Sequence, residues 1–204
     1  MKYFLLILIS YLLGSIPFSH ILPRLKGHDI SQKGTKNVGA TNALIVAGPI
    51  IGALALIGDI AKGFLAVAMV HYFLKDAPTW LPIFCGFTAI AGHDFSVFLK
   101  FKGGKGLATA SGVWLAIDPI LAFLFILLWI LIILVSRYFI MSTVVLFGLI
   151  PIFLLIFGKS WQLILFGFAT FFLTAYTHRR DIWRFFEGKE MKASAALKYY
   201  LNKE

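Results

Sequence analysis

The chain consists of long apolar blocks separated by short clusters of charge. Five charge-free blocks reach 17 residues or more without a polar opening, and they occupy residues 3–23, 77–93, 119–136, 138–158 and 160–178. A helix needs about 20 mostly apolar residues to cross the hydrocarbon core of a membrane. The blocks lack the alternation of apolar and polar positions that is typical of membrane-spanning strands. The pattern therefore predicts an all-α integral membrane protein.

The region between residues 37 and 75 is less regular. Residues 37–58 open with a polar run, and the next apolar block is short. We expect a half-helix over residues 42–56 that turns near Gly58, and a second helix over residues 60–75 that completes the crossing. Non-helical backbone at membrane depth is tolerated only where protein or water covers it. The region therefore predicts one broken crossing beside a water-filled cavity.

The distribution of Lys and Arg predicts the orientation. If residues 20–41 are cytoplasmic, the cytoplasmic loops and tail hold four, three, one and seven Lys or Arg residues, and only three lie outside. Cytoplasmic loops carry such an excess. We therefore expect seven transmembrane helices, some short or broken, around a cavity on the cytoplasmic side. The N-terminus would lie outside and the C-terminus in the cytoplasm.

Composition narrows the class further. Of the 204 residues, 60% are apolar and only 14% are charged, against about 25% in an average soluble domain. A soluble domain of this size is nearly excluded, because it has too little interior for so much apolar surface. One cysteine, Cys85, excludes a disulfide framework. The net charge of +10 favours anionic head groups or phosphates as partners.

Residues 34–42 form a polar, glycine-containing segment before an apolar run. They supply hydroxyl, amide and exposed backbone N–H groups. Backbone N–H groups at helix N-termini and in glycine-rich nests bind phosphate. The segment predicts either a phosphate-binding loop or an ordinary loop with Thr41 or Asn42 as the N-cap of the next helix.

Residues 101–106, Phe-Lys-Gly-Gly-Lys-Gly, precede another apolar helix. The spacing is not that of a Walker A motif. Bare backbone flanked by Lys102 and Lys105 nevertheless suits an anion. The alternative is a loop whose lysines extend to the aqueous boundary. Three glycines in four positions favour the anion-binding interpretation.

Three further sets of ionisable residues interrupt the apolar pattern. Asp59 and Lys62 share a helix face, which predicts a mutually neutralising pair that could also shape a site. His93 adjoins Asp94, which indicates a base with its orienting carboxylate or a histidine satisfied at a helix end. His178 opens a basic run where the last long helix leaves the membrane. It is a candidate base, phosphate donor or boundary residue.

His71 and Asp76 have the His-x4-Asp spacing of acyl-CoA-dependent acyltransferases. Two fixed residues are a weak signal, and the expected topology places both at the outer end of a helix. We interpret the spacing as coincidence and keep an acyl-CoA acyltransferase as an alternative.

Taken together, the motifs resemble the PlsY family of bacterial acyl-phosphate:glycerol-3-phosphate acyltransferases. The matching segments follow one another along nearly the whole chain, at residues 14–18, 37–42, 58–59, 62–63, 92–93, 101–106, 108–109 and 178–179. The resemblance implies a single transmembrane domain over residues 1–204, with a basic tail at 178–204, in the bacterial inner membrane. It also implies transfer of a fatty acyl group from acyl phosphate to the 1-hydroxyl of glycerol 3-phosphate. The products would be lysophosphatidic acid and phosphate.

The chemistry implied by the resemblance suits the residues. Acyl phosphate is already activated, so the protein has to position two anions and stabilise developing charge. We expect Lys105, His178 and Asn37 to be the catalytic residues. We expect the substrates to be bound by Thr35, Lys36, Thr41, Asn42, Lys102, Gly103, Gly104, Gly106, Thr143, Arg179 and Asp181. No cofactor, metal or nucleic acid is expected, and the partners are the two substrates, the lipid bilayer and the enzyme that makes acyl phosphate.

The chain departs from the usual family pattern at several positions. Lys36 stands in place of a Gly and Ile45 in place of an Arg, while Ile140 and Thr143 replace Ser and Asp181 replaces Asn. Lys36 is a candidate substitute for the missing Arg. A diverged paralogue with altered specificity or lower activity therefore remains an alternative, as does a transporter or binding protein for a phosphorylated metabolite.

Overall fold

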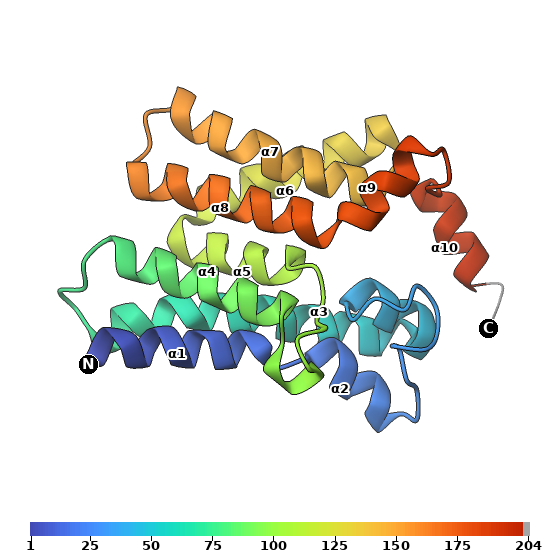
Figure 1. Cartoon of the computed structure of the whole chain (residues 1–204), viewed down its shortest axis with the longest axis horizontal. Coiled ribbons are helices and arrows are strands. Elements are labelled where there is room, and N and C mark those ends of the chain that lie inside the picture. The colour runs from blue at the N-terminus through green and yellow to red at the C-terminus, as the bar shows by residue number, and fades with distance from the viewer. Residues whose placement is uncertain (202–204) are drawn as a thin grey trace. The chain divides into compact units, whose positions relative to one another are not determined.

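The computed structural model describes residues 1–201, and these form helices joined by loops, of which the one between α2 and α3 is long (Figure 1). The elements are α1 (Lys2–Ser15), α2 (Phe18–Leu25), α3 (Ala40–Phe73), α4 (Trp80–Asp94), the 3-10 turn η1 (Val97–Leu99), α5 (Leu107–Ile117), α6 (Pro119–Ser136), α7 (Phe139–Ile156), α8 (Trp161–Thr177), α9 (Arg179–Phe186) and α10 (Ala193–Leu201). Residues 1–201 contain no strand, so the all-α prediction is confirmed.

Contacts divide the chain into two compact units, Met1–Ile117 and Asp118–Tyr199. In the first unit α1 packs along α4, and α3 packs against α2, α4 and α5. In the second unit α7 packs against α6, α8 and α9. The expectation of one domain over the whole chain stays a prediction.

Five segments within residues 1–201 are long and apolar enough to cross a membrane. They are Lys2–Leu25, Ala40–Phe73, Trp80–Leu99, Pro119–Ser136 and Phe139–Ile156. Two shorter apolar helices, Leu107–Ile117 and Trp161–Thr177, accompany them. Large apolar side chains are widely exposed on these helices, which suits contact with lipid. The structure is that of a multi-span membrane protein, while the count of seven crossings stays a prediction.

The break within α3 lies at Gly48, so the prediction of a turn near Gly58 was wrong. Gly48 has φ 85° and ψ 172°, a conformation that only glycine adopts readily. Pro49 follows it, lacks an N–H group and disfavours a helical conformation for the preceding residue. Gly58 lies inside the second helical segment, residues 49–73, where the ring of Phe18 packs against it.

The first apolar block is also broken, although we expected residues 3–23 to form one helix. α1 ends at Ser15 and α2 begins at Phe18, so the helix is interrupted around Pro17. Proline removes one backbone hydrogen bond and clashes with the preceding turn of a helix. The carbonyl of Ile16 is thereby released from the helical ladder and accepts a hydrogen bond from a side chain of α3, described below.

Helices of the first unit approach one another closely at glycines. A Cβ at Gly14 would collide with the backbone of Ala89, and one at Gly63 with the backbone of Thr109. Gly112 likewise packs against the backbone of Ile60. Small residues allow membrane helices to pack backbone against backbone. These contacts hold α1 close to α4 and α3 close to α5, and they therefore help to position the loops at the ends of these helices.

Candidate active site

The first polar loop, residues 30–42, is held together by the side chain of Asn42. Its Nδ2 donates to the carbonyls of Ile30, Lys33 and Asn37 at 2.8, 3.2 and 3.0 Å, and its Oδ1 accepts from the N–H of Thr35 at 2.8 Å. Asn42 is 1% exposed. The side chain of Asn42, which we expected to bind substrate, therefore makes its hydrogen bonds with the loop itself.

α3 begins at Ala40 with Gly39 as its N-cap, and no side chain caps it. The alternative that Thr41 or Asn42 caps this helix was therefore wrong. The reason is that Asn42 already lies inside the first helical turn, where its amide reaches back to the preceding loop. Thr41, one residue earlier, is exposed.

Thr35, Lys36 and Asn37 lie at the tip of the same loop. Thr35 and Lys36 are exposed, and Asn37 is half-buried. The Thr35 hydroxyl lies 3.4 Å from the N–H of Asn37. Lys36 has φ 59°, in the left-handed region that favours glycine. Lys36 thus occupies a turn conformation that glycine would adopt without strain.

The start of this loop is ordered by a small polar turn. The Ser31 hydroxyl and its N–H both donate to the Asp29 carboxylate, at 2.6 and 3.0 Å. These two bonds lower the pKa of Asp29 below its ordinary value because they stabilise the charged form. The turn is exposed, so it shapes the loop on the aqueous side.

The glycine loop, residues 101–106, folds back on the end of α4. The N–H groups of Gly103 and Gly104 donate to the carbonyls of Asp94 and His93, both at 3.0 Å. The N–H of Phe101 donates to the carbonyl of Ser96 at 2.8 Å. Two of the N–H groups that the sequence suggested for phosphate binding are therefore used inside the protein.

The two loops meet at Gly104. A side chain at this position would collide with the carbonyl of Val38 from the first loop and with Nε2 of His93 from α4. A side chain at Gly103 would collide with the carbonyl of His93. Glycine is required because three segments of backbone and one imidazole ring converge here. Lys105, which is half-buried, follows directly.

α5 begins just after Gly106, which has φ 72°. The first N–H groups of a helix have no partner within that helix and carry partial positive charge. The Asp94 carboxylate packs against Gly106, and its Oδ1 has no hydrogen-bond partner within residues 1–201. Lys102 is exposed. This end of α5 thus combines backbone donors, two lysines and one buried carboxylate.

A buried polar network lies behind the glycine loop. Lys62 Nζ lies 2.8 Å from Asp59 Oδ1, and both side chains are 1% exposed. The Ser19 hydroxyl donates to Asp59 Oδ2 at 2.5 Å, and His93 Nδ1 lies 3.6 Å from Asp59 Oδ1. The structure shows the predicted Asp59–Lys62 pair. The His93–Asp94 pairing considered from the sequence was wrong, because His93 faces Asp59 on another helix.

This network is tied to α1 as well. Lys62 Nζ donates to the Ile16 carbonyl at 2.8 Å. The Ser96 hydroxyl donates to the Ser15 carbonyl at 2.5 Å, and the Tyr11 hydroxyl donates to the Phe95 carbonyl at 2.8 Å. The residues after α4 are thus anchored on α1 by two hydrogen bonds before the glycine loop begins.

The predicted residues of the second unit lie on α7 and where α8 ends. His178, 3% exposed, places Nδ1 3.2 Å from Asp181 Oδ2. Arg179 donates to the Tyr176 carbonyl at 2.7 Å and stacks over the Tyr176 ring. Asp181 in place of Asn thus faces an imidazole.

Thr143, also in the second unit, is 1% exposed. Its hydroxyl accepts from Trp129 Nε1 and donates to the Phe139 carbonyl, both at 3.1 Å. The hydroxyl therefore acts as acceptor for a side chain of α6 and as donor to a carbonyl of α7.

Two other residues singled out in the sequence, Ile45 and His71, lie on α3. Ile45 is 6% exposed and packs in an apolar cluster with Ile30, Val38 and Val46. The position of the missing Arg is therefore an apolar interior position in this chain. His71 is exposed in the last turn of α3, at the opposite end of that helix from the first polar loop.

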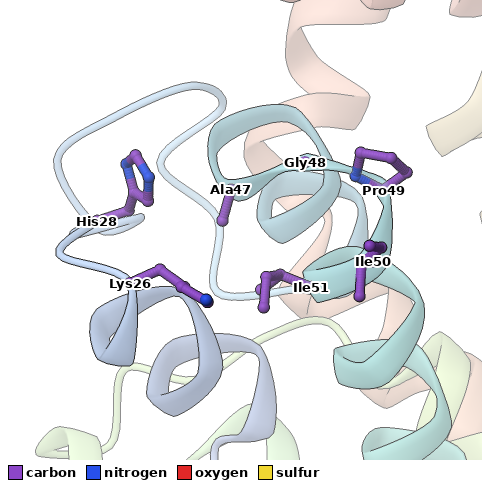
Figure 2. A pocket seen from close by; sticks show the side chains of 7 residues that line it. All are labelled: Lys26, His28, Ala47, Gly48, Pro49, Ile50 and Ile51. Atoms are coloured by element: carbon purple, nitrogen blue, oxygen red, sulfur yellow. The ribbon is translucent and has the colours of Figure 1, made fainter.

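A hollow of about 360 Å³ lies beside the break in α3, at residues 47–51, whereas the sequence led us to expect the break and a cavity beside it near Gly58. A water-filled cavity on the cytoplasmic side stays a prediction. Figure 2 shows Lys26 and His28 on one side of this hollow and residues 47–51 on the other. The Gly-Pro pair within an apolar run is the signal that could have located it. Within residues 1–201 no cluster of three or more His, Cys, Asp or Glu side chains could hold a metal ion.

Comparison with known proteins finds relatives that share one description. The sequence profile of a family described as glycerol-3-phosphate acyltransferase matches residues 4–188. The chain is 38% identical over 195 residues to the glycerol-3-phosphate acyltransferase of Pseudothermotoga lettingae, with 94% of each chain covered. It is 37% identical over 205 residues to that of Thermosipho melanesiensis, with 100% of this chain and 98% of the relative covered.

Crystal structures of PlsY, described as an integral membrane glycerol 3-phosphate acyltransferase, have a similar fold. The glycerol 3-phosphate form has a TM-score of 0.86 and 34% identity, covering 94% of this chain and 96% of that chain. The lysophosphatidic acid form has a TM-score of 0.86 and 32% identity, covering 98% and 100%. The resemblance found in the sequence is confirmed, and this chain belongs to the glycerol-3-phosphate acyltransferase (PlsY) family of integral membrane proteins.

Proposed function

We propose that this protein transfers a fatty acyl group from acyl phosphate to the 1-hydroxyl of glycerol 3-phosphate. Family membership and the glycerol 3-phosphate and lysophosphatidic acid forms of the solved relative support the acceptor and the product. The observation that carries the proposal is the meeting of the first polar loop and the glycine loop at Gly104, directly before Lys105. Such a place suits a phosphate-bearing substrate.

The proposed reaction needs no nucleophile from the protein. The 1-hydroxyl oxygen attacks the carbonyl carbon of acyl phosphate, and the bond from that carbon to the phosphate oxygen breaks. Phosphate leaves with the bonding electrons, and the hydroxyl proton passes to a phosphate oxygen. The protein then has two tasks, which are to hold two anions in line and to stabilise charge that develops on the carbonyl oxygen.

In the first unit we assign the electrostatic task to Lys105 and to the N–H groups of the first turn of α5. An ammonium group and the positive end of a helix both stabilise an anion. Gly103, Gly104 and Gly106 would contribute by allowing close approach of backbone. The hydroxyl of Thr35, the amide of Asn37 and the charge of Lys36 lie at the tip of the other loop, where a second phosphate would bind. We also assign Thr41, in the first turn of α3, and Lys102, in the glycine loop, to substrate binding.

In the second unit we assign His178 as a phosphate donor or base. Asp181 faces its Nδ1 and orients the ring, and a carboxylate behind an imidazole stabilises the charged form of the ring. Thr143 could donate to substrate only by giving up its bond to the Phe139 carbonyl, whereas Arg179 is exposed and its bond to the Tyr176 carbonyl uses one of five guanidinium N–H groups.

The proposed location is the bacterial inner membrane, with the N-terminus outside and the C-terminus in the cytoplasm. The excess of Lys and Arg in the loops at residues 20–41 and 100–105 and in the tail supports it. A cytoplasmic site would receive glycerol 3-phosphate from solution and acyl phosphate from the enzyme that makes it, which we propose as a partner.

A two-donor assay tests this function. Purified protein is given glycerol 3-phosphate with either acyl phosphate or acyl-CoA, and lysophosphatidic acid is measured. We expect turnover with acyl phosphate, and Lys105→Ala to lose roughly 10- to 100-fold in kcat/KM, since a hydrogen bond to a charged group is worth about 1.5–3 kcal/mol. Lys33→Ala removes the same charge from a neighbouring loop and should leave the rate near that of wild type.

Each other outcome identifies an alternative. Turnover with acyl-CoA that is lost in His71→Ala would indicate an acyl-CoA acyltransferase. No turnover with either donor, together with movement of glycerol 3-phosphate across vesicles containing the protein, would indicate a transporter.

A further inference from the structure

We propose that Asp59 and His93 are positioning residues, which fix the glycine loop and hence the place of Lys105. The proposal rests on the proposed function, because it concerns how that site is assembled. The sequence indicated that the Asp59–Lys62 pair could shape a site and that His93 could be a base, but neither Asp59 nor His93 was counted among the expected catalytic or substrate-binding residues. Neither needs to touch a substrate in this role.

The loop is held at its glycines by the backbone of α4. The carbonyls of His93 and Asp94 accept from Gly104 and Gly103, so the loop follows any movement of these two residues. A loop with three glycines in four positions has little stiffness of its own. Its position must therefore come from what it is attached to.

The side chain of His93 is the rigid part of that attachment. The ring is buried, with Nε2 against Gly104 on one side and Nδ1 3.6 Å from Asp59 on the other. The imidazole thus fills the space between a helix carboxylate and the glycine loop. Rotation of the ring would open a gap on one side or cause a collision with Gly104 on the other.

Asp59 is itself fixed from three directions. Ser19 donates to one oxygen, and Lys62 and His93 face the other. Lys62 in turn donates to the Ile16 carbonyl, which lies at the break around Pro17 and also accepts from the N–H of Phe18. Through this buried carboxylate, the imidazole that lies against the glycine loop is tied to α2 and α3, in addition to the bonds that Ser96 and Phe95 make with α1.

A single substitution in this network leaves an unpaired buried charge, which destabilises the protein. A loss of activity could then come either from a displaced loop or from unfolding. We therefore compare two double variants, Asp59→Asn with Lys62→Met and Asp59→Leu with Lys62→Met. Both lose the two charges and the bond to Ile16. They differ only in the side chain that replaces Asp59, because asparagine keeps an oxygen facing His93 and leucine does not.

The readouts are the thermal unfolding midpoint and the kinetics with acyl phosphate and glycerol 3-phosphate. We expect equal midpoints, with the asparagine double variant within about threefold of wild type in kcat/KM and the leucine double variant roughly 10- to 100-fold lower, as expected for an active-site group displaced by about 1 Å. Equal kcat/KM in the two double variants would overturn the proposal.

A second measurement applies if the leucine double variant fails to fold. Gly104→Ala should lose activity in wild type, because its methyl group meets both Nε2 of His93 and the carbonyl of Val38, and removal of the ring relieves the first of these two collisions. It should cost several-fold less in a His93→Ala background, where the ring is absent. Strict additivity of the two changes would overturn the positioning role. If instead Lys105→Ala keeps full activity, the proposed function itself fails, whatever these variants show.

Discussion

Replacement of Asn42 should open the first polar loop without unfolding the protein. Asn42 is the residue through which four backbone groups of residues 30–37 are held together, and it is buried at the start of α3. We compare Asn42→Leu, which has a similar volume and no polar atoms, with Asn42→Asp. The aspartate keeps the acceptor for the Thr35 N–H but places a negative oxygen opposite three carbonyls.

The magnitude follows from the contacts. Nδ2 has two hydrogens shared among three carbonyls, so about three full hydrogen bonds are lost in the leucine variant. At about 1 kcal/mol each, and with part of the loop regaining water, the closed loop loses roughly 2–4 kcal/mol. This is roughly a 30- to 1,000-fold shift toward the open loop. Aspartate should be at least as costly, because its charge is buried against carbonyl oxygens.

Hydrogen exchange of the loop amides measures this shift directly. Protection over residues 30–41 should fall in both variants, while residues 74–79 of the same molecule serve as the internal reference. The KM for glycerol 3-phosphate should rise in parallel, because Thr35 and Asn37 lose their fixed places. If Asn42→Asp kept native protection while Asn42→Leu lost it, the single acceptor bond to Thr35 would hold the loop, and our assignment of the three donor bonds would be wrong.

Three other predictions address separate parts of the chain. Lys36→Gly should raise the unfolding temperature by relieving about 1 kcal/mol of left-handed strain, and should raise the KM for glycerol 3-phosphate if the ammonium binds phosphate; an unchanged KM would mean that the charge plays no part. Gly63→Val should abolish folded protein, as followed by size-exclusion recovery, whereas Leu65→Val on the exposed side of the same helix should not. With Cys85 replaced, a cysteine at position 36 should react with an impermeant reagent only from the cytoplasm and one at position 159 only from outside; the reverse pattern would refute the topology.

Helix limits in the second unit could be predicted closely from the sequence. The charge-free block 119–136 coincides with α6, because Asp118 caps the helix through bonds to the N–H groups of Ile120 and Leu121, and Pro119 starts it. Membrane helices are defined mainly by the length of an apolar run, and charged residues mark where such a run meets water. This information is local, so a single sequence contains it.

The break in α3 and the partner of His93 could not be predicted in the same way. Gly48 and Gly58 both interrupt apolar runs, and the decisive difference was the proline after Gly48. Asp94 is the neighbour of His93 in sequence, but adjacent residues on a helix point in different directions. The imidazole faces Asp59 because α3 and α4 pack together, and that contact depends on the whole fold.

The glycine contacts of the first unit have a consequence for how such a protein can change over generations. Where Gly14, Gly63 and Gly112 lie directly on the backbone of a neighbouring helix, even a methyl group has no space, so these positions have almost no freedom to vary. Apolar side chains on the outer surface, by contrast, meet only fluid acyl chains, and many different ones serve equally well. Substitutions that adapt the protein to a thicker, thinner or warmer bilayer should therefore accumulate on the outer surface. A saturation-mutagenesis library should show glycine positions that tolerate almost no substitution, beside exposed helix faces that tolerate many.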